Sequence, residues 1–306
     1  MNAPGCGAAA PLTSVVNAMT IDVEDYFHVS VFDGVVPRRE WDRLESRVGA
    51  NTDRLIELFG EAGIRATFFV LGWVGERFPQ LVRRIAEAGH EVASHGHAHR
   101  LIYDQTRQAF REDVRRAKGV LESVTGLAVD GYRAPSYSIT PRSLWALDVL
   151  IEEGYTYDSS IFPIHHDRYG IPLSPRHPYL IARRRGSLME VPASTVRYGP
   201  LNLPIGGGGY FRILPYAWTR WGIRQLNQVE GRPAVFYLHP WEIDPAQPRL
   251  PASRLSRFRH YHNLDQTESR LRALLRDFRF SSMRKVFHAE EVAAPSTFAV
   301  ALPYVW

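Results

Sequence analysis

Residues 15–25 read VVNAMTIDVED, an apolar, β-prone run that ends in three carboxylates, Asp22, Glu24 and Asp25. Because a buried strand does not tolerate such charge without a partner, we expect the acids where a strand emerges from the core. A solvated turn after the strand is the alternative interpretation. Complementary groups follow several later β-prone runs, and this recurrence favours a shared site.

A second pattern repeats along the chain and predicts alternating helices and strands. A helical segment closes at an acidic residue near a glycine, and a β-prone run follows at once. Glycine just past a helix end takes the left-handed conformation that stops the helix. The glycines of this kind are Gly63, Gly89, Gly154 and Gly231. In the first of these helices, Asn51 or Thr52 is the expected cap.

Seven strands are expected, near residues 15–22, 66–71, 91–95, 130–133, 155–158, 188–192 and 234–239. Strands that alternate with helices in this way imply βαβ units and a mostly parallel sheet, so the predicted fold class is α/β. In parallel folds of the barrel type, functional groups collect at the carboxyl ends of the strands. The polar clusters of this chain fall at those positions.

The third expected strand runs into SHGHAH at residues 94–99. His95 and His99 are four residues apart and share one face whether the segment is extended or helical, so two imidazoles can reach one cation. His97 joins them only if the segment stays extended. A lone histidine usually has a structural role, but three within five residues after a buried strand favour a metal site.

Three later strand ends add further polar groups. Arg133, in GYRAPSY at residues 131–137, requires an anion, and a structural salt bridge is the alternative interpretation. Asp158 begins the sequence DSS, for which a helix cap or turn is the alternative. His239 follows the last apolar strand, in FYLHPWE at residues 236–242.

In their order, these motifs resemble those of the polysaccharide deacetylases with a NodB-homology domain, carbohydrate esterases that remove N-acetyl or O-acetyl groups from glycans. The family's aspartate pair, His-x-x-x-His, Arg-x-Pro, aspartate and Leu-His motifs have counterparts over residues 15–242. The motif sequences DVEDYFH, SHGHAHR and LHPWE are most similar to those of the subgroup of proteins found with exosortase-linked exopolysaccharide loci. That subgroup carries a C-terminal extension. The resemblance implies a distorted (β/α) barrel of about seven strands with a small C-terminal appendage.

The resemblance also implies roles for individual residues. Asp22 would be the general base, oriented by Arg133, and His239 would be the general acid. His95 and His99 would bind one divalent metal ion. Amide hydrolysis needs an activated water, a stabilised oxyanion and a proton for the departing amine. Zinc is the default ion for a His-His-carboxylate set.

The first motif departs from the family pattern, because the usual adjacent Asp-Asp is here DVED. In an extended strand Glu24 shares a face with Asp22 while Asp25 points away. Glu24 is therefore preferred as the third metal ligand, with Asp25 as the alternative. Asp158 is expected to support the charge on His239.

Residues 206–212 read GGGGYFR and are interpreted as a mobile rim loop. Tyr210, Phe211 and Arg212 would close over a bound sugar, by stacking and hydrogen bonding. A plain flexible connection is the alternative. Pro135 and Tyr137, in and after the Arg-x-Pro motif, are further candidate substrate-binding residues.

Composition limits the remaining interpretations. The 306 residues, 45% of them hydrophobic, suffice for one large domain or two small ones. The formal charge of +5 is spread along the chain, with a local basic excess at residues 183–185 and between Arg249 and Arg284. A solvated face is the favoured interpretation, an anionic or membrane-proximal partner is the alternative, and no nucleic-acid partner is expected. Cys6 is the single cysteine, so any metal must be held by histidine and carboxylate.

Three parts of the chain are expected: a loose leader over residues 1–13, a deacetylase barrel over 14–244 and an extension over 245–306 packed on the barrel. The leader lacks the basic and apolar regions of a secretory signal, and no stretch approaches 18 uninterrupted apolar residues. A cytoplasmic location is expected, and peripheral association with exopolysaccharide machinery is compatible with it.

The leading functional hypothesis is a metal-dependent hydrolase that removes N-acetyl groups from an amino-sugar exopolysaccharide or its lipid-linked precursor. One alternative is hydrolysis of a non-peptide C–N bond in a small cyclic amide, which the same scaffold supports. Another is a catalytically silent glycan-binding or assembly factor. Asp22, Arg133 and His239 argue against a silent factor, because binding alone requires no base and acid pair.

Overall fold

The computed structural model describes residues 12–291. Most of the expected leader and the end of the expected extension, residues 292–306, lie outside the described residues. Within the described part, no helix has the length and apolarity needed to cross a bilayer.

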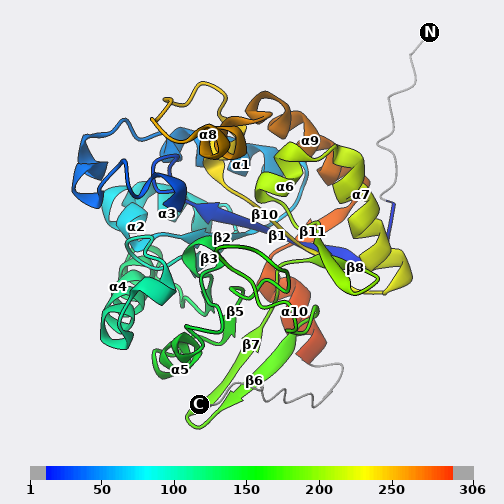
Figure 1. Ribbon diagram of the computed structural model, residues 1–306, viewed down its shortest axis with the longest axis horizontal. Coiled ribbons are helices and arrows are strands. Elements are labelled where there is room, and N and C mark those ends of the chain that lie inside the picture. The colour runs from blue at the N-terminus through cyan, green and yellow to red at the C-terminus, as the bar shows by residue number, and fades with distance from the viewer. Residues whose placement is uncertain (1–11, 292–306) are drawn as a thin grey trace.

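A nine-stranded sheet forms the centre of the described fold (Figure 1). Its order is β10-β1-β2-β3-β4-β5-β7-β6, and β11 pairs with β1 outside that path. All pairings in this sheet are parallel except that of β6 with β7. The expected strands correspond to β1 Val16–Val23, β2 Thr67–Val70, β3 Glu91–Ser94, β4 Gly131–Tyr132, β5 Tyr157–Asp158, β7 Gly186–Glu190 and β10 Val235–Leu238. The α/β fold class with a mostly parallel sheet is therefore confirmed.

Four further strands were not expected from the sequence. They are β6 Tyr179–Arg183, β8 Thr195–Tyr198, β9 Leu201–Pro204 and β11 Arg279–Ser281. β8 and β9 form a separate antiparallel hairpin, and β11 is only three residues long. Short strands of this kind carry too little hydrophobic periodicity to be recognised in the sequence.

Helices lie around the sheet (Figure 1). Their bounds are α1 Val48–Glu61, α2 Gly72–Arg77, α3 Pro79–Glu87, α4 Arg107–Thr125, α5 Trp145–Glu152, α6 Gly208–Ile213, α7 Tyr216–Arg224, α8 Arg254–Tyr261, α9 Leu264–Asp277 and α10 Met283–Glu291. The expected helix-terminating glycines Gly63, Gly89, Gly154 and Gly231 have φ values of 65°, 79°, 75° and 64°. Their left-handed backbones confirm the predicted helix–strand junctions.

The predicted cap of α1 is wrong. The helix begins at Val48, ahead of Asn51 and Thr52, and the side chain of its N-cap residue, Arg47, makes no capping hydrogen bond. Asp25 instead serves this helix end from outside: its Oδ2 accepts hydrogen bonds from Arg47 N–H at 2.8 Å and Val48 N–H at 3.1 Å. A distant carboxylate satisfies the free N–H groups, so no cap signal is needed in the local sequence.

β1 is the strand on which the site depends. Its odd-numbered residues Met19, Ile21 and Val23 are buried in the main hydrophobic cluster. Its even-numbered residues face the other way, where Asp22 is 2% exposed. β10 and β2 flank β1 in parallel, so the carboxyl ends of these strands meet at one edge of the fold.

Candidate active site

Two strand ends bring together a cluster of metal-ligating side chains. Glu24 follows β1, and His95 and His99 follow β3. One ligand atom from each residue lies within 4.8 Å of the others, and His99 Nε2 is 2.7 Å from Glu24 Oε2. The backbone of His99 is left-handed, with φ of 47°, in the turn that places its ring centroid 5.5 Å from that of His95.

The cluster fits a divalent cation. Glu24, His95 and His99 are at most 2% exposed, and Glu24 Oε2, although close to His99, accepts no hydrogen bond from the described residues. His95 Nδ1 donates to the Arg133 carbonyl at 2.8 Å, which leaves the Nε2 lone pair available. Burial lowers the pKa of His95 to about 4, so its imidazole is neutral, as a metal ligand must be.

Asp25 lies outside this cluster. Besides the two N–H groups at the start of α1, its Oδ2 accepts a hydrogen bond from Ser46 Oγ at 2.6 Å. Its own N–H donates to His28 Nδ1 at 2.9 Å. The structure thus groups Glu24, and not Asp25, with the two histidines.

Arg133 is fully buried at the end of β4 and faces Asp22. One of its Nη atoms donates to Asp22 Oδ1 and Thr20 Oγ1, each at 2.7 Å. Its Nε donates to the Ser159 carbonyl at 3.2 Å, and the other Nη donates to the Ser159 hydroxyl at 3.0 Å. The guanidinium is held on three sides, so it orients the Asp22 carboxylate.

His239 follows β10 and lies near both Asp22 of β1 and Glu24, which follows β1. Its Nε2 is 3.8 Å from Asp22 Oδ2 and 3.7 Å from Glu24 Oε1. Its Nδ1 donates to Glu242 Oε1 at 2.7 Å, and Arg212 bonds the other Glu242 oxygen. Burial alone would lower the pKa of His239, but the carboxylates of Glu24, Glu242 and Asp22 raise it to about 9.

The sequence predicted that Asp158 supports the charge on His239, and this prediction is wrong. The carboxylate that accepts the hydrogen bond of His239 belongs to Glu242. Asp158 pairs in register with Glu190 of β7, and the Ser160 hydroxyl donates to its Oδ1. Burial raises the pKa of Asp158 to about 6, and burial and Asp158 raise the pKa of Glu190 well above its usual value. The signal that was missed lies within the last motif, because Glu242 is three residues after His239.

The expected mobile rim loop at residues 206–212 is also corrected. Gly207 forms a parallel bridge with Tyr237 of β10, and a Cβ at Gly207 would lie 1.9 Å from the Tyr237 carbonyl oxygen. The glycines thus allow close packing against β10. Phe211 packs against Phe236 and Arg212 bonds Glu242, so neither buried side chain is free to close over a sugar.

The remaining candidate substrate residues border one aromatic cluster. Tyr137 is 5% exposed, and its ring centroid is 5.2 Å from those of Phe162 and Tyr237. Tyr210 packs against the same cluster, 6.4 Å from Phe162. Pro135 is buried and starts the short 3₁₀ helix that carries Tyr137.

Comparison with known proteins supplies two family matches. The polysaccharide deacetylase family matches residues 40–157, and a domain of unknown function, DUF3473, matches residues 159–288. The first match contains His95, His99 and Arg133, whereas His239 lies in the second. Asp22 and Glu24 precede both.

Among curated proteins, the peptidoglycan deacetylase of Helicobacter pylori is 31% identical over 114 residues. The alignment covers 37% of this chain and 37% of that relative, so the chain matches less than two fifths of the relative's length.

Solved structures support the fold. The crystal structure of a Mycobacterium smegmatis protein assigned to the polysaccharide deacetylases has a TM-score of 0.61 and 23% identity, and the match covers 94% of each chain. The PuuE allantoinase has a TM-score of 0.64 at 15% identity, with 97% of this chain and 100% of that chain covered. These matches identify the deacetylase and allantoinase type of (β/α) barrel. Residues 40–157 therefore match the polysaccharide deacetylase family, and the DUF3473 match over residues 159–288 contains β10, which pairs with β1 in the central sheet.

Proposed function

We propose that the protein is a metal-dependent hydrolase that removes N-acetyl groups from an amino-sugar glycan. One observation carries the proposal: Glu24, His95 and His99 form a buried ligand set directly beside Asp22 and His239. Binding a glycan requires neither a ligand set nor an acid and base pair, whereas amide hydrolysis uses all of them.

Each residue has a part that follows from its contacts. Glu24, His95 and His99 would hold the ion, for which zinc suits two imidazoles and one carboxylate. When bound, the ion would polarise the acetamide carbonyl and activate a water molecule. Asp22 would accept a proton from the attacking water through Oδ2, because Oδ1 accepts a hydrogen bond from Arg133.

His239 is positioned to protonate the departing amine. Its Nδ1 is committed to Glu242, which leaves Nε2 on the side of Asp22 and Glu24. Glu242 and Arg212 hold the ring in this orientation. The proton that leaves the water and the proton that reaches the amine are thus handled by two different residues.

The finer substrate proposal is an N-acetylated exopolysaccharide or its lipid-linked precursor. It is supported by the resemblance of the first and last motifs to the exosortase-linked subgroup. A cytoplasmic location, with peripheral association with the polysaccharide machinery, belongs to the same proposal.

The test combines elemental analysis with acetate release. Purified protein is analysed for bound metal, acetate release is measured with N-acetylated oligosaccharides, and ring opening is measured with allantoin as a cyclic amide. We expect one zinc per chain, acetate from the oligosaccharides and no ring opening of allantoin. Turnover of the cyclic amide without acetate release from any glycan would overturn the proposal.

A further inference from the structure

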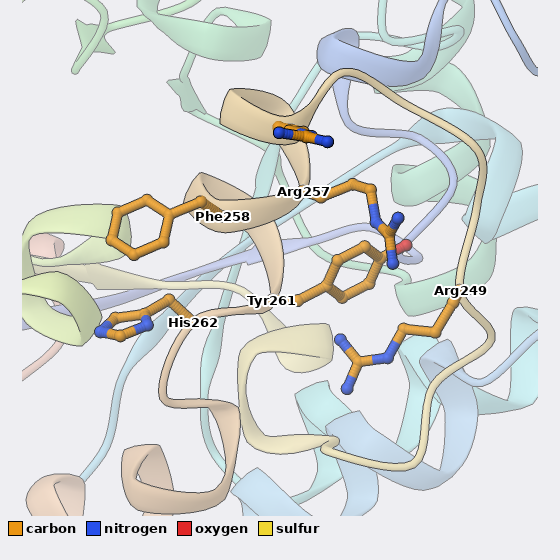
Figure 2. A pocket seen from close by; sticks show the side chains of 6 residues that line it. Arg249, Arg257, Phe258, Tyr261 and His262 are labelled. Atoms are coloured by element: carbon orange, nitrogen blue, oxygen red, sulfur yellow. The ribbon is translucent and has the colours of Figure 1, made fainter.

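An open pocket rich in arginine lies next to the candidate active site. It has a volume of about 430 Å³ and is formed by α8 and the segments on either side of it (Figure 2). Its lining residues are Arg249, Arg254, Arg257, Phe258, Tyr261 and His262.

Two of the three arginines in this pocket lie beside one tyrosine, Tyr261. The Arg249 guanidinium carbon is 4.3 Å from the Tyr261 ring centroid, and Figure 2 shows the side chains of Arg249 and Arg257 beside that ring. The Leu250 N–H donates to the Tyr261 hydroxyl at 2.8 Å, which fixes the ring. Burial raises the pKa of Tyr261, while the Leu250 N–H and the two guanidinium groups act to lower it.

These arginines lack internal counter-charges. Arg272 on the neighbouring α9 is paired with Glu61 and Glu268. In contrast, none of the three pocket arginines forms an ion pair with a carboxylate of the described chain. Several guanidinium groups around one opening repel one another, and a bound oxyanion relieves that repulsion while accepting bidentate hydrogen bonds.

The pocket is tied to the active site through His260, the neighbour of Tyr261. The His260 ring stacks on Trp241, with centroids 4.2 Å apart. Trp241 in turn stacks on His239 and donates from Nε1 to Glu24 Oε1 at 3.1 Å.

A second link runs through Arg212, which bonds Glu242 and also donates to the carbonyls of Arg259 and His260. The end of α8 is therefore attached to the same ion pair that orients His239. A ligand group in the pocket would be held at a fixed position relative to the candidate metal site.

We propose that this pocket binds an oxyanion, phosphate or carboxylate, carried by the glycan whose N-acetyl group is hydrolysed. The proposal rests on the proposed function for the identity of the substrate. Arginine recognises both oxyanions by the same bidentate geometry, and Phe258, which is 48% exposed, offers a ring on which a sugar stacks. The anion comes from one of two sources, a uronate within the polymer or the diphosphate of a lipid-linked precursor.

The first experiment measures binding without turnover. Inorganic pyrophosphate and a galacturonate trimer are titrated calorimetrically into metal-free protein, at low and at moderate salt. The test variant combines Arg249→Gln, Arg254→Gln and Arg257→Gln. The control combines Arg184→Gln, Arg224→Gln and Arg232→Gln, three exposed arginines that form no ion pair with another described residue.

We expect the wild-type protein and the control variant to bind at least one probe with affinities within twofold of each other, and the test variant to bind it at least tenfold more weakly. Tighter binding of pyrophosphate assigns the pocket to a lipid-linked precursor, and tighter binding of the trimer assigns it to a uronate-containing polymer. Absence of binding to both probes, or equal losses in the two variants, would overturn the proposal, because equal losses indicate general attraction to a basic protein.

The second experiment asks whether the pocket contributes to substrate selection. kcat/KM for acetate release is compared between acidic and neutral N-acetylated oligosaccharides of equal length. We expect a preference for the acidic substrate of about tenfold or more, abolished in the test variant and kept in the control. No acetate release from any glycan would contradict the proposed function but leave the binding result intact. An unchanged preference in the test variant would contradict the proposal that this pocket binds the anionic group of the substrate.

Discussion

Glu24 and Asp25 are adjacent acids with different surroundings, and their variants separate metal binding from helix anchoring. Glu24→Gln removes the anionic ligand beside His95 and His99, so we expect loss of stoichiometric metal with little change in the stability of the metal-free protein. Asp25→Asn weakens the hydrogen bonds at the start of α1 and should cost about 0.5–2 kcal/mol while metal is retained. Metal content per chain and urea denaturation check both, and the reverse outcome would show that Asp25 is the ligand.

Asp22 and His239 are the proposed proton carriers and lie outside the ligand set of Glu24, His95 and His99. Asp22→Asn and His239→Ala should each lower kcat by about 10² or more, because general acid and base groups contribute on that scale. Bound metal and the circular dichroism spectrum should remain those of the wild-type protein. A His239→Ala protein that has lost its metal would assign His239 to the ligand set.

At the scale of elements, α6 shows a packing role where the sequence predicted a mobile loop. Phe211 lies edge-on to Phe236 of β10, with ring centroids 4.9 Å apart. Phe211→Ala should therefore destabilise the fold by about 3–5 kcal/mol, the usual cost of emptying such a core position. Tyr210→Ala, one residue earlier and partly exposed, is the matched control and should cost much less. Equal losses of stability in urea denaturation would contradict this assignment.

At the scale of the whole molecule, the buried Asp158 and Glu190 pair makes stability depend on pH. Folding raises the pKa of Asp158 from 3.8 to about 6 and raises that of Glu190 as well. The folded protein therefore holds protons that the unfolded chain releases. This stabilisation is fully present below the unfolded pKa and is lost as the pH rises through about 6.

The variant Glu190→Gln removes one titrating group of the pair while it keeps a hydrogen-bond donor. We expect the free energy of unfolding of the wild-type protein to fall relative to that of the variant as the pH rises from 4 to 9, because the raised pKa of the Glu190 carboxyl exists only in the wild-type protein. Urea denaturation across this range is the measurement, and a constant difference between the two proteins would refute the shared-proton interpretation.

The sequence alone determined the alternation of elements and the positions of the principal polar groups. Gly63, Gly89, Gly154 and Gly231 marked helix ends because only glycine takes a left-handed backbone without steric cost. The acids after β1 and the histidines after β3 were recognisable because charge directly after a buried apolar run needs a partner. Parallel topology then implied that these groups meet at one edge, and the structure brings Glu24, His95 and His99 together there.

Only the tertiary structure decided the partners of those groups. Asp25 caps α1 by accepting hydrogen bonds from residues 22 and 23 positions later in the chain. His239 forms its hydrogen bond with Glu242 and not with Asp158. The glycine run at 206–209 packs against β10. Through its local periodicity, the sequence predicts which residues lie at the end of a strand and on which face of the sheet their side chains lie. It does not report which distant side chain fills the space opposite, because that depends on how the helices and the C-terminal segments pack around β1.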